Sequence, residues 1–309
     1  MSDAPKDSLD ASTRYCAVFG HPIRHSASPA MQNAALAALR LNWRYLAFDV
    51  LPGQLRAAID GARVMGFIGL NLTVPHKLLA ADMVDLLDDQ ARTSGAVNTI
   101  VFETRDGAGN WVPLAGVPAG QAAEVRCRGC NTDADAIVRS LQEDFARESW
   151  RGASVLLLGA GGAARTAALR LAREAVGALF LVNRTAARAA ELAREIRREY
   201  PAVGVAEGYP GHPVDLVINA TSLGLKPDDP LPIDLAWLKS HRPQFVYDMI
   251  YRPAETGLLR AARAAGCRAA NGAGMLLYQG ARALELWTGR PAPLAVMREA
   301  LRKNLESYV

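Results

Sequence analysis

Short apolar runs alternate with amphipathic stretches along the chain. Tyr15–Gly20, Trp43–Val50 and the run from Phe67 into Asn71 each have the length and composition of a buried strand. The two segments between them, from Ser28 to about Arg40 and from Pro52 to Arg63, predict helices. Strands and helices in this order predict an α/β domain with a mostly parallel sheet.

The second half of the chain repeats the alternation. A helix is predicted from about Ala134 to Arg147, and the buried strand Ser154–Gly159 follows it. Further strands are predicted at Ala178–Val182, Val214–Asn219 and Gln244–Asp248, and two last helices run through Leu276–Trp287 and from about Pro293 to Leu305. With 309 residues the chain is long enough for two such domains.

Two segments lack this pattern. The first dozen residues are polar, so they predict a loose tail without the apolar segment of a signal peptide. Glu103–Arg128 is rich in Gly and Pro and is predicted to be an inserted loop or ribbon. Because no apolar run reaches the roughly 18 residues that span a bilayer, we expect a soluble, cytoplasmic protein without a membrane partner.

The charge balance is mildly basic, with 35 Lys and Arg against 31 Asp and Glu. The arginines are interleaved with acidic residues, as in Glu191–Glu199, which is typical of a solvated helix and not of a nucleic-acid-binding stripe. We expect no nucleic-acid partner.

The four cysteines and five histidines do not form a recognisable reactive cluster. Cys16 and Cys267 lie in predicted strands and are expected in the core. Cys127 and Cys130 form a lone C-x-x-C without a second pair or a nearby histidine, so neither a zinc site nor a redox pair is expected. The histidines lie mostly in loops and form no catalytic triad, so we predict no metal and no catalytic histidine.

A glycine-rich turn follows the strand that ends at Gly159. Its residues Gly159, Ala160, Gly161, Gly162 and Ala163 lead into Ala164 with the spacing G-x-G-x-x-A, and an alanine-rich helix begins there. Glycines permit the tight turn and let a diphosphate approach the amides at the helix N-terminus. With a strand before and a helix and second strand after, this turn predicts a dinucleotide site.

The second strand of that unit ends at Asn183-Arg184-Thr185, where NAD sites usually carry an acidic residue. Arg184 instead offers a planar donor fork for a 2′-phosphate, and Arg188 lies one helical turn onward. These residues favour NADP over NAD, although Arg188 could equally belong to a solvated helix face.

Lys77 is one of only five lysines and comes just beyond a buried strand. Unlike Arg, Lys can give up and recover a proton when its surroundings tune it. Since α/β proteins place their chemistry beyond the carboxyl ends of strands, Lys77 is a candidate acid. The alternative is a surface lysine that opens a helix.

Polar residues at three further points are candidate ligands. Ser26 and Ser28 lie at a helix N-terminus, where a carboxylate can bind, with Ser28 suited as N-cap and Pro29 as the first helical residue. Asn98 is predicted to be a buried amide that bonds either to the backbone or to a ligand. Asp133 is either a site residue or the N-cap of the following helix.

Together these motifs resemble those of the shikimate dehydrogenase family, including its quinate/shikimate branch. The matching blocks are Gly20–Ile23, Asn71–Lys77, Gly95–Thr99, Asn131–Asp133, Gly159–Arg165, Asn183–Thr185, Asn219–Gly224, Asp248–Tyr251 and Asn271–Gly289.

The resemblance implies two domains. After a tail over residues 1–13, a substrate-binding α/β domain over 14–132 would be completed by returning helices over 274–309. A Rossmann NADP-binding domain would cover 133–273. We expect a monomer or a homodimer.

The resemblance also implies roles for individual residues. Lys77 and Asp133 would be the catalytic pair, and Ser26 and Ser28 would hold the substrate carboxylate. The substrate pocket would be lined by Thr73, Asn98, Asp133, Tyr251 and Gln279. Gly159 to Ala163 would bind the diphosphate, Asn183 to Thr185 the adenosine phosphate, and Met249 and Gly272 would lie on the nicotinamide side.

Three positions depart from the family pattern: Gln32 stands where many members have His, Ala134 replaces the Gly that commonly follows Asn-Thr-Asp, and Glu103–Arg128 is longer than usual. The resemblance implies NADP-dependent reduction of 3-dehydroshikimate to shikimate in aromatic amino-acid biosynthesis. A quinate/shikimate dehydrogenase acting oxidatively and a non-catalytic NADP sensor remain alternatives, and the presence of both Lys77 and Asp133 argues against the sensor.

Overall fold

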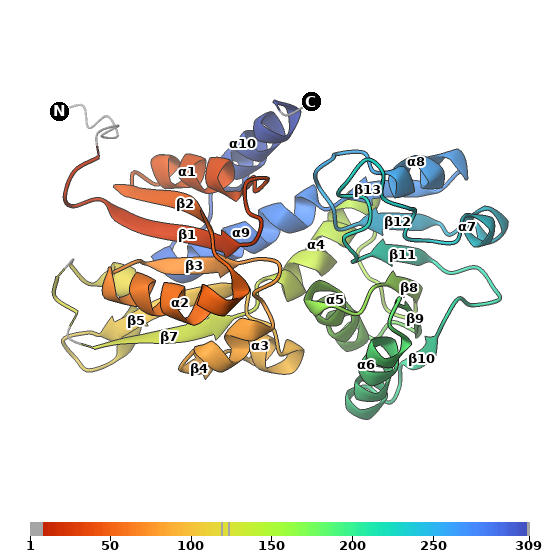
Figure 1. The fold of residues 1–309 in the computed structure, drawn as a ribbon, viewed down its shortest axis with the longest axis horizontal. Coiled ribbons are helices and arrows are strands. Elements are labelled where there is room, and N and C mark those ends of the chain that lie inside the picture. Colours follow the sequence, from red (N-terminus) through yellow and green to blue (C-terminus); the bar gives the residue numbers. More distant parts are fainter. Residues whose placement is uncertain (1–8, 119, 123, 308–309) are drawn as a thin grey trace. The chain divides into compact units, whose positions relative to one another are not determined.

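The computed structural model describes residues 9–118, 120–122 and 124–307 (Figure 1). The chain divides into two compact units. The first contains the described residues up to Thr132 together with those from Gln279 onward, and the second is the continuous segment Asp133–Tyr278. Each unit has its own sheet and core, and each is described by itself.

The first unit is built on a seven-stranded sheet in the order β2-β1-β3-β5-β7-β4, with β6 beside β5. Six of these strands run in one direction, and β5 runs against its neighbours β3, β6 and β7. The strands are β1 (Arg14–Gly20), β2 (Trp43–Asp49), β3 (Gly69–Leu72), β4 (Leu86–Leu87), β5 (Thr99–Arg105), β6 (Trp111–Pro113) and β7 (Val125–Cys130).

Helices cover this sheet. They are α1 (Ser28–Ala38), η1 (Pro52–Gln54), α2 (Leu55–Val64), η2 (Leu79–Met83), α3 (Asp89–Ser94), η3 (Leu114–Gly116), the second half of α9 (Ala273–Thr288) and α10 (Leu294–Glu306). On one face, Leu55 and Ile59 of α2 pack against Phe19. On the other, the indole Nε1 of Trp287 donates to the carbonyl oxygen of Ile100 at 3.0 Å. A Cβ on Gly69 would lie 2.0 Å from that Nε1, so this close approach requires glycine.

The start of α1 differs from the prediction. The helix begins at Ser28, one residue early, and its N-cap is Ala27, which makes no side-chain cap. The Ser28 N–H donates instead to the Ser26 hydroxyl oxygen at 3.3 Å, so a short serine turn replaces the predicted Ser28 cap. The helix also ends at Ala38, before the predicted Arg40, because Arg40 has a left-handed backbone with φ of 55°.

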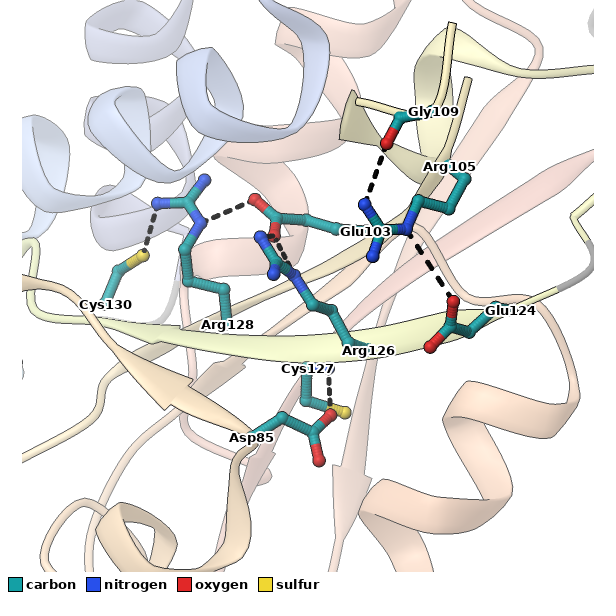
Figure 2. Close-up of polar contacts among 9 residues, drawn as sticks. All are labelled: Asp85, Glu103, Arg105, Gly109, Glu124, Arg126, Cys127, Arg128 and Cys130. Atoms are coloured by element: carbon teal, nitrogen blue, oxygen red, sulfur yellow. Dashed lines mark hydrogen bonds and ion pairs between the residues drawn. The ribbon is translucent and has the colours of Figure 1, made fainter. Parts of the chain in front are cut away.

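The predicted inserted segment is a β-ribbon made by the end of β5, β6 and β7. In Figure 2 the buried carboxylate of Glu103 lies between two arginines of β7. Arg126 Nε donates to Glu103 Oε2 at 2.8 Å and Arg128 Nε to Oε1 at 2.6 Å. The guanidinium groups of Arg105 and Arg126 also lie 4.2 and 4.1 Å from the ring centre of Trp111.

The second unit has a six-stranded sheet in the order β10-β9-β8-β11-β12-β13, and every pairing in it is parallel. The strands are β8 (Ser154–Leu158), β9 (Ala178–Val182), β10 (Gly204–Glu207), β11 (Leu216–Asn219), β12 (Phe245–Asp248) and β13 (Arg268–Asn271). The predicted α/β class with parallel-rich sheets is confirmed.

Helices lie on both faces of this sheet. They are α4 (Asp133–Phe145), α5 (Gly162–Arg173), α6 (Ala186–Glu199), α7 (Leu235–His241), α8 (Gly257–Ala264) and the first half of α9. Trp237 of α7 and Leu258 of α8 share a core with Leu156 and Val246. On the opposite face Phe145 packs on Phe245, with ring centres 4.7 Å apart. Helix α4 ends there, short of the predicted Arg147, because Ala146 has φ of 50°.

The predicted tail is described only in part, since residues 1–8 lie outside the described residues. Among those that follow, Ser12 and Thr13 form a turn bonded to the side chain of Asn42. No helix in the described part of the chain is both long and apolar enough to cross a bilayer.

Replacing Glu103 by Gln is expected to lower the free energy of unfolding by about 1–3 kcal/mol, because two arginines lose a shared buried carboxylate. Both arginines keep about a quarter of their surface in water (27% and 24%), so the loss should be smaller than for a fully buried pair. Urea unfolding measures it.

The matched control is Glu124→Gln, since Glu124 pairs with Arg105 at 3.7 Å but is 66% exposed. This change should stay within about 0.5 kcal/mol. Equal losses for both variants would contradict a structural role for the Glu103 cluster.

Candidate active site

Lys77 lies beyond the carboxyl end of β3, in a turn that is held at several points. The Thr73 N–H donates to the Phe19 carbonyl of β1 at 3.0 Å, and the His76 N–H donates back to the Thr73 carbonyl at 2.8 Å. The Lys77 carbonyl accepts from the Val97 N–H at 2.8 Å. Lys77 is partly buried. Its bond to Val97 holds its backbone next to Asn98, the residue that precedes β5.

Asn98 is buried, as predicted, and its amide is bonded to Thr132. Its Nδ2 donates to the Thr132 hydroxyl at 2.9 Å, and its Oδ1 accepts from the Thr132 N–H at 2.8 Å. Asp133 follows directly at the start of α4, with 2% of its surface exposed. The Asn98 side chain therefore fixes the backbone immediately before Asp133.

Further buried polar side chains hold Asn98 in place. They were not identified from the sequence. Asn71 Nδ2 donates to the Thr99 hydroxyl at 3.0 Å, and its Oδ1 accepts from the Tyr45 hydroxyl at 2.7 Å. The Thr99 hydroxyl donates to Asn98 Oδ1 at 3.2 Å. The available signal was a run of polar residues at strand positions that are otherwise apolar, since such groups are buried only with partners.

Ser26 and Ser28 are brought together at the first turn of α1. Ser28 is buried and Ser26 partly buried. The unpaired amides of a helix N-terminus attract an anion. Two hydroxyls at this point can add donors for a carboxylate.

Gln32, which departs from the family pattern, is also buried in α1. Its Nε2 donates to the carbonyl oxygen of Gly280 at 2.9 Å. Gly280 follows Gln279 in α9, so Gln32 holds the helix backbone beside a predicted substrate ligand.

In the second unit, the glycine turn after β8 has the shape that a diphosphate needs. Gly159 has φ of 111°, and a Cβ on it would lie 3.1 Å from the Ala220 carbonyl oxygen. Gly161 is the N-cap of α5, and nothing lies within 4 Å of a Cβ built on it. The space over Gly161 and the free amides at the start of α5 fit a dinucleotide phosphate.

The end of β9 fits NADP. Asn183 Nδ2 donates to the Thr185 carbonyl at 2.9 Å and so shapes the turn, while Arg184 and Arg188 are exposed. Arg165 of α5 pairs with Glu195 of α6. Arg184 is the cation at this strand end, in the place where an NAD site carries a carboxylate.

Met249 and Gly272 meet at the carboxyl ends of β12 and β13. The Gly272 N–H donates to the Ile250 carbonyl at 3.1 Å, and a Cβ on Gly272 would lie 2.1 Å from the Met249 carbonyl oxygen. Tyr251, two residues beyond Met249, is partly buried.

The four cysteines are all buried and free, and Cys130 is the last residue of β7. Burial raises the pKa of Cys127 to about 11 and that of Cys130 to about 12. Within the part of the chain that the structure describes, no group of three or more His, Cys, Asp or Glu side chains could hold a metal ion.

A parallel sheet with strand order 3-2-1-4-5-6 and a glycine turn opening into a helix defines a dinucleotide-binding Rossmann protein. Three family models match this chain: the shikimate dehydrogenase substrate binding domain over residues 18–100, shikimate / quinate 5-dehydrogenase over 140–223, and the shikimate 5′-dehydrogenase C-terminal domain over 272–302. The chain belongs to the shikimate dehydrogenase family.

Individual relatives agree over nearly their whole length. The chain is 45% identical to a shikimate dehydrogenase (NADP(+)) of Moorella thermoacetica, covering 96% of this chain and 95% of the relative. It is 39% identical to one of Methanopyrus kandleri, covering 96% and 98%. The crystal structure of shikimate 5-dehydrogenase from Thermus thermophilus with NADP(H) and shikimate has a TM-score of 0.77 at 32% identity, covering 94% and 100%.

Replacing Gly161 by Ala is expected to weaken dinucleotide binding by about tenfold or more, because the new methyl group takes the space through which a diphosphate approaches the amides. Stability should change by only a few tenths of a kcal/mol, since the position has an ordinary backbone and open surroundings. Titration calorimetry measures the dinucleotide affinity, and thermal unfolding measures the stability.

Gly211→Ala provides the matched control, because nothing lies within 4 Å of its Cβ either and it is distant from the glycine turn in the chain. Unchanged dinucleotide affinity in Gly161→Ala would show that the diphosphate does not bind this turn.

Proposed function

We propose that this protein is an NADP-dependent shikimate dehydrogenase, which reversibly reduces 3-dehydroshikimate to shikimate in aromatic amino-acid biosynthesis. One observation carries the proposal: the glycine turn at the carboxyl edge of a parallel sheet, with Arg184 at the next strand end, in a chain 45% identical to an NADP(+) shikimate dehydrogenase. The first unit would bind the substrate and the second the cofactor.

We assign the cofactor contacts to the carboxyl edge of the second sheet. Gly159, Ala160, Gly161, Gly162 and Ala163 would hold the diphosphate with the amides of α5. The adenosine 2′-phosphate would be bound by Asn183, Arg184, Thr185 and Arg188, and the nicotinamide side would be lined by Met249 and Gly272. NADPH, when bound, supplies the hydride for a carbonyl carbon.

The substrate contacts would come from Ser26, Ser28, Thr73, Asn98, Asp133, Tyr251 and Gln279. Ser26 and Ser28 would hold the carboxylate at the N-terminus of α1. Asn98 has one amide hydrogen beyond its bond to Thr132, which suits it to a substrate hydroxyl.

Lys77 would donate the proton. As hydride reaches the carbonyl carbon, negative charge grows on the carbonyl oxygen, and an ammonium group there stabilises the charge and protonates the oxygen. In the reverse direction the neutral amine takes the proton back. The Asp133 carboxylate would orient Lys77 and favour its charged form, and no other proton carrier is needed for the step.

The test is a direct assay of the purified protein. The absorbance of NADPH should fall with 3-dehydroshikimate and rise when NADP+ is supplied with shikimate. Quinate and NAD+ run in parallel distinguish the oxidative quinate enzyme. No turnover with any combination would leave only a cofactor-binding protein. The cytoplasmic location and a monomeric or homodimeric state stay predictions.

Lys77→Ala is expected to lower kcat by about 10²–10⁴-fold with little change in KM for shikimate, since a general acid acts mainly in the transition state. Lys239→Ala, an exposed lysine of α7, serves as control and should be unaffected. A large rise in KM at unchanged kcat would instead make Lys77 a binding residue.

Arg184→Ala is expected to weaken NADP+ by about tenfold or more and NAD+ by less than about twofold, because only NADP+ has the 2′-phosphate that a guanidinium fork binds. Arg194→Ala, an exposed arginine further along α6, is the control. Equal losses for both cofactors would remove Arg184 from the 2′-phosphate site.

A further inference from the structure

The carboxylate of Asp248, the last residue of β12, is fully buried and accepts three hydrogen bonds. Thr256 Oγ1 donates to its Oδ2 at 2.6 Å. Asn219 Nδ2 and the Ile250 N–H donate to its Oδ1 at 2.9 and 3.1 Å. We call Asn219, Asp248, Ile250 and Thr256 the Asp248 network.

One end of the Asp248 network is bonded to the loop after β11, which lies next to Gly159 of the glycine turn. Asn219 ends β11, and its Oδ1 accepts from the N–H and the hydroxyl of Thr221 at 3.0 and 2.7 Å. A Cβ on Gly159 would lie 3.3 Å from the Thr221 methyl group. Asn219 therefore holds the loop that borders the diphosphate site.

The other end fixes the turn from Met249 to Tyr251. The Met249 N–H donates to the Asn219 carbonyl at 3.0 Å, the Ile250 N–H donates to Asp248, and the Ile250 carbonyl accepts from Gly272. These bonds hold the backbone on both sides of the Met249 side chain.

The topology of the sheet says which half of a dinucleotide this turn would meet. Strand order reverses at β8, with β9 and β10 on one side and β11, β12 and β13 on the other. The adenosine half of a dinucleotide lies over the strand that follows the glycine turn, here β9. The second nucleotide must then lie over β11 and β12, where the Asp248 network is.

We propose that Asp248 is a positioning residue for hydride transfer, which fixes the Met249–Tyr251 turn through its three hydrogen bonds and so determines how the nicotinamide half binds. The proposal rests on the proposed function. The adenosine half would lie over β9, on the other side of the point where the strand order reverses.

A buried carboxylate suits this task because two oxygens can accept from all three donors at once. Burial raises the pKa of Asp248, and the hydrogen bonds from Thr256, Ile250 and Asn219 act against that rise. Thr256 is itself fixed, since its hydroxyl accepts from the Leu259 N–H as the N-cap of α8.

The experiment compares Asp248→Asn, Thr256→Val and Thr256→Ser with the wild-type protein. Two ligands are titrated: NADP+, and adenosine 2′,5′-bisphosphate, which lacks the nicotinamide half. Asp248→Asn and Thr256→Val should each weaken NADP+ by about tenfold and lower kcat by a similar factor, as expected for a hydrogen bond to a charged group. Both should bind the bisphosphate as the wild type does.

Thr256→Ser keeps the hydroxyl donor and should restore NADP+ affinity and kcat, which a loss of packing alone would not allow. Asp215→Asn is the control for general damage, because Asp215 accepts from the Ser154 N–H at 2.8 Å at the amino end of the same sheet. Asp215→Asn should lower the thermal midpoint and leave the affinities for both ligands unchanged.

The inference is overturned if the Asp248→Asn and Thr256→Val variants lose the same affinity for both ligands. It is also overturned if both affinities stay unchanged and only the thermal midpoint falls. Either result would make Asp248 a structural residue only. The binding difference is measured without turnover. A wild-type protein that fails to reduce 3-dehydroshikimate would therefore refute the proposed function, and the two ligands would still decide how Asp248 acts.

Discussion

The first unit depends most on the hydrogen bonds made by the side chain of Asn98. Its amide bonds to both the hydroxyl and the backbone of Thr132, so the end of β7 is fixed to the start of β5. Asp133 is the residue after Thr132, and the Lys77 carbonyl accepts from the N–H of Val97, the residue before Asn98. Both proposed acid–base residues therefore adjoin this bonded segment. Burying an amide without hydrogen-bond partners costs free energy. The fold is therefore stable only in an arrangement that supplies all of these bonds.

In the second unit, too, an asparagine side chain holds a turn by hydrogen bonds. At the end of β11, Asn219 bonds forward to its own loop and sideways to Asp248. In both units an Asn near a strand end thus fixes a turn by hydrogen bonds. Apolar packing forms the two sheets, but it cannot orient a turn at their edges, where the backbone groups leave the ladder.

The apolar pattern predicted most of the strands because each buried strand is a short run bounded by turn residues. It could not show that β5 runs opposite to its neighbours, since alternation of side chains is the same in either direction. It also missed β10, whose residues are mostly exposed, and hence lack an apolar signature. The predicted cap at Ser28 failed because the serine pair bonds to itself.

The site was predictable to different depths. The glycine turn and Arg184 could be found because their chemistry lies in adjacent residues. The partners of Asn98 and Asp248 could not, since Thr132 and Asn219 are 34 and 29 residues away and only the fold brings them close. Local spacing identifies a phosphate site, whereas a network between strand ends needs three-dimensional structure.

Helix α9 has a consequence for how the protein is made. The second unit is one continuous segment, but the first needs α9 and α10 to close its core, with Trp287 fully buried against Ile100. During synthesis the second unit can fold while the first still lacks its last helices. The first unit, although its translation begins first, is therefore completed last.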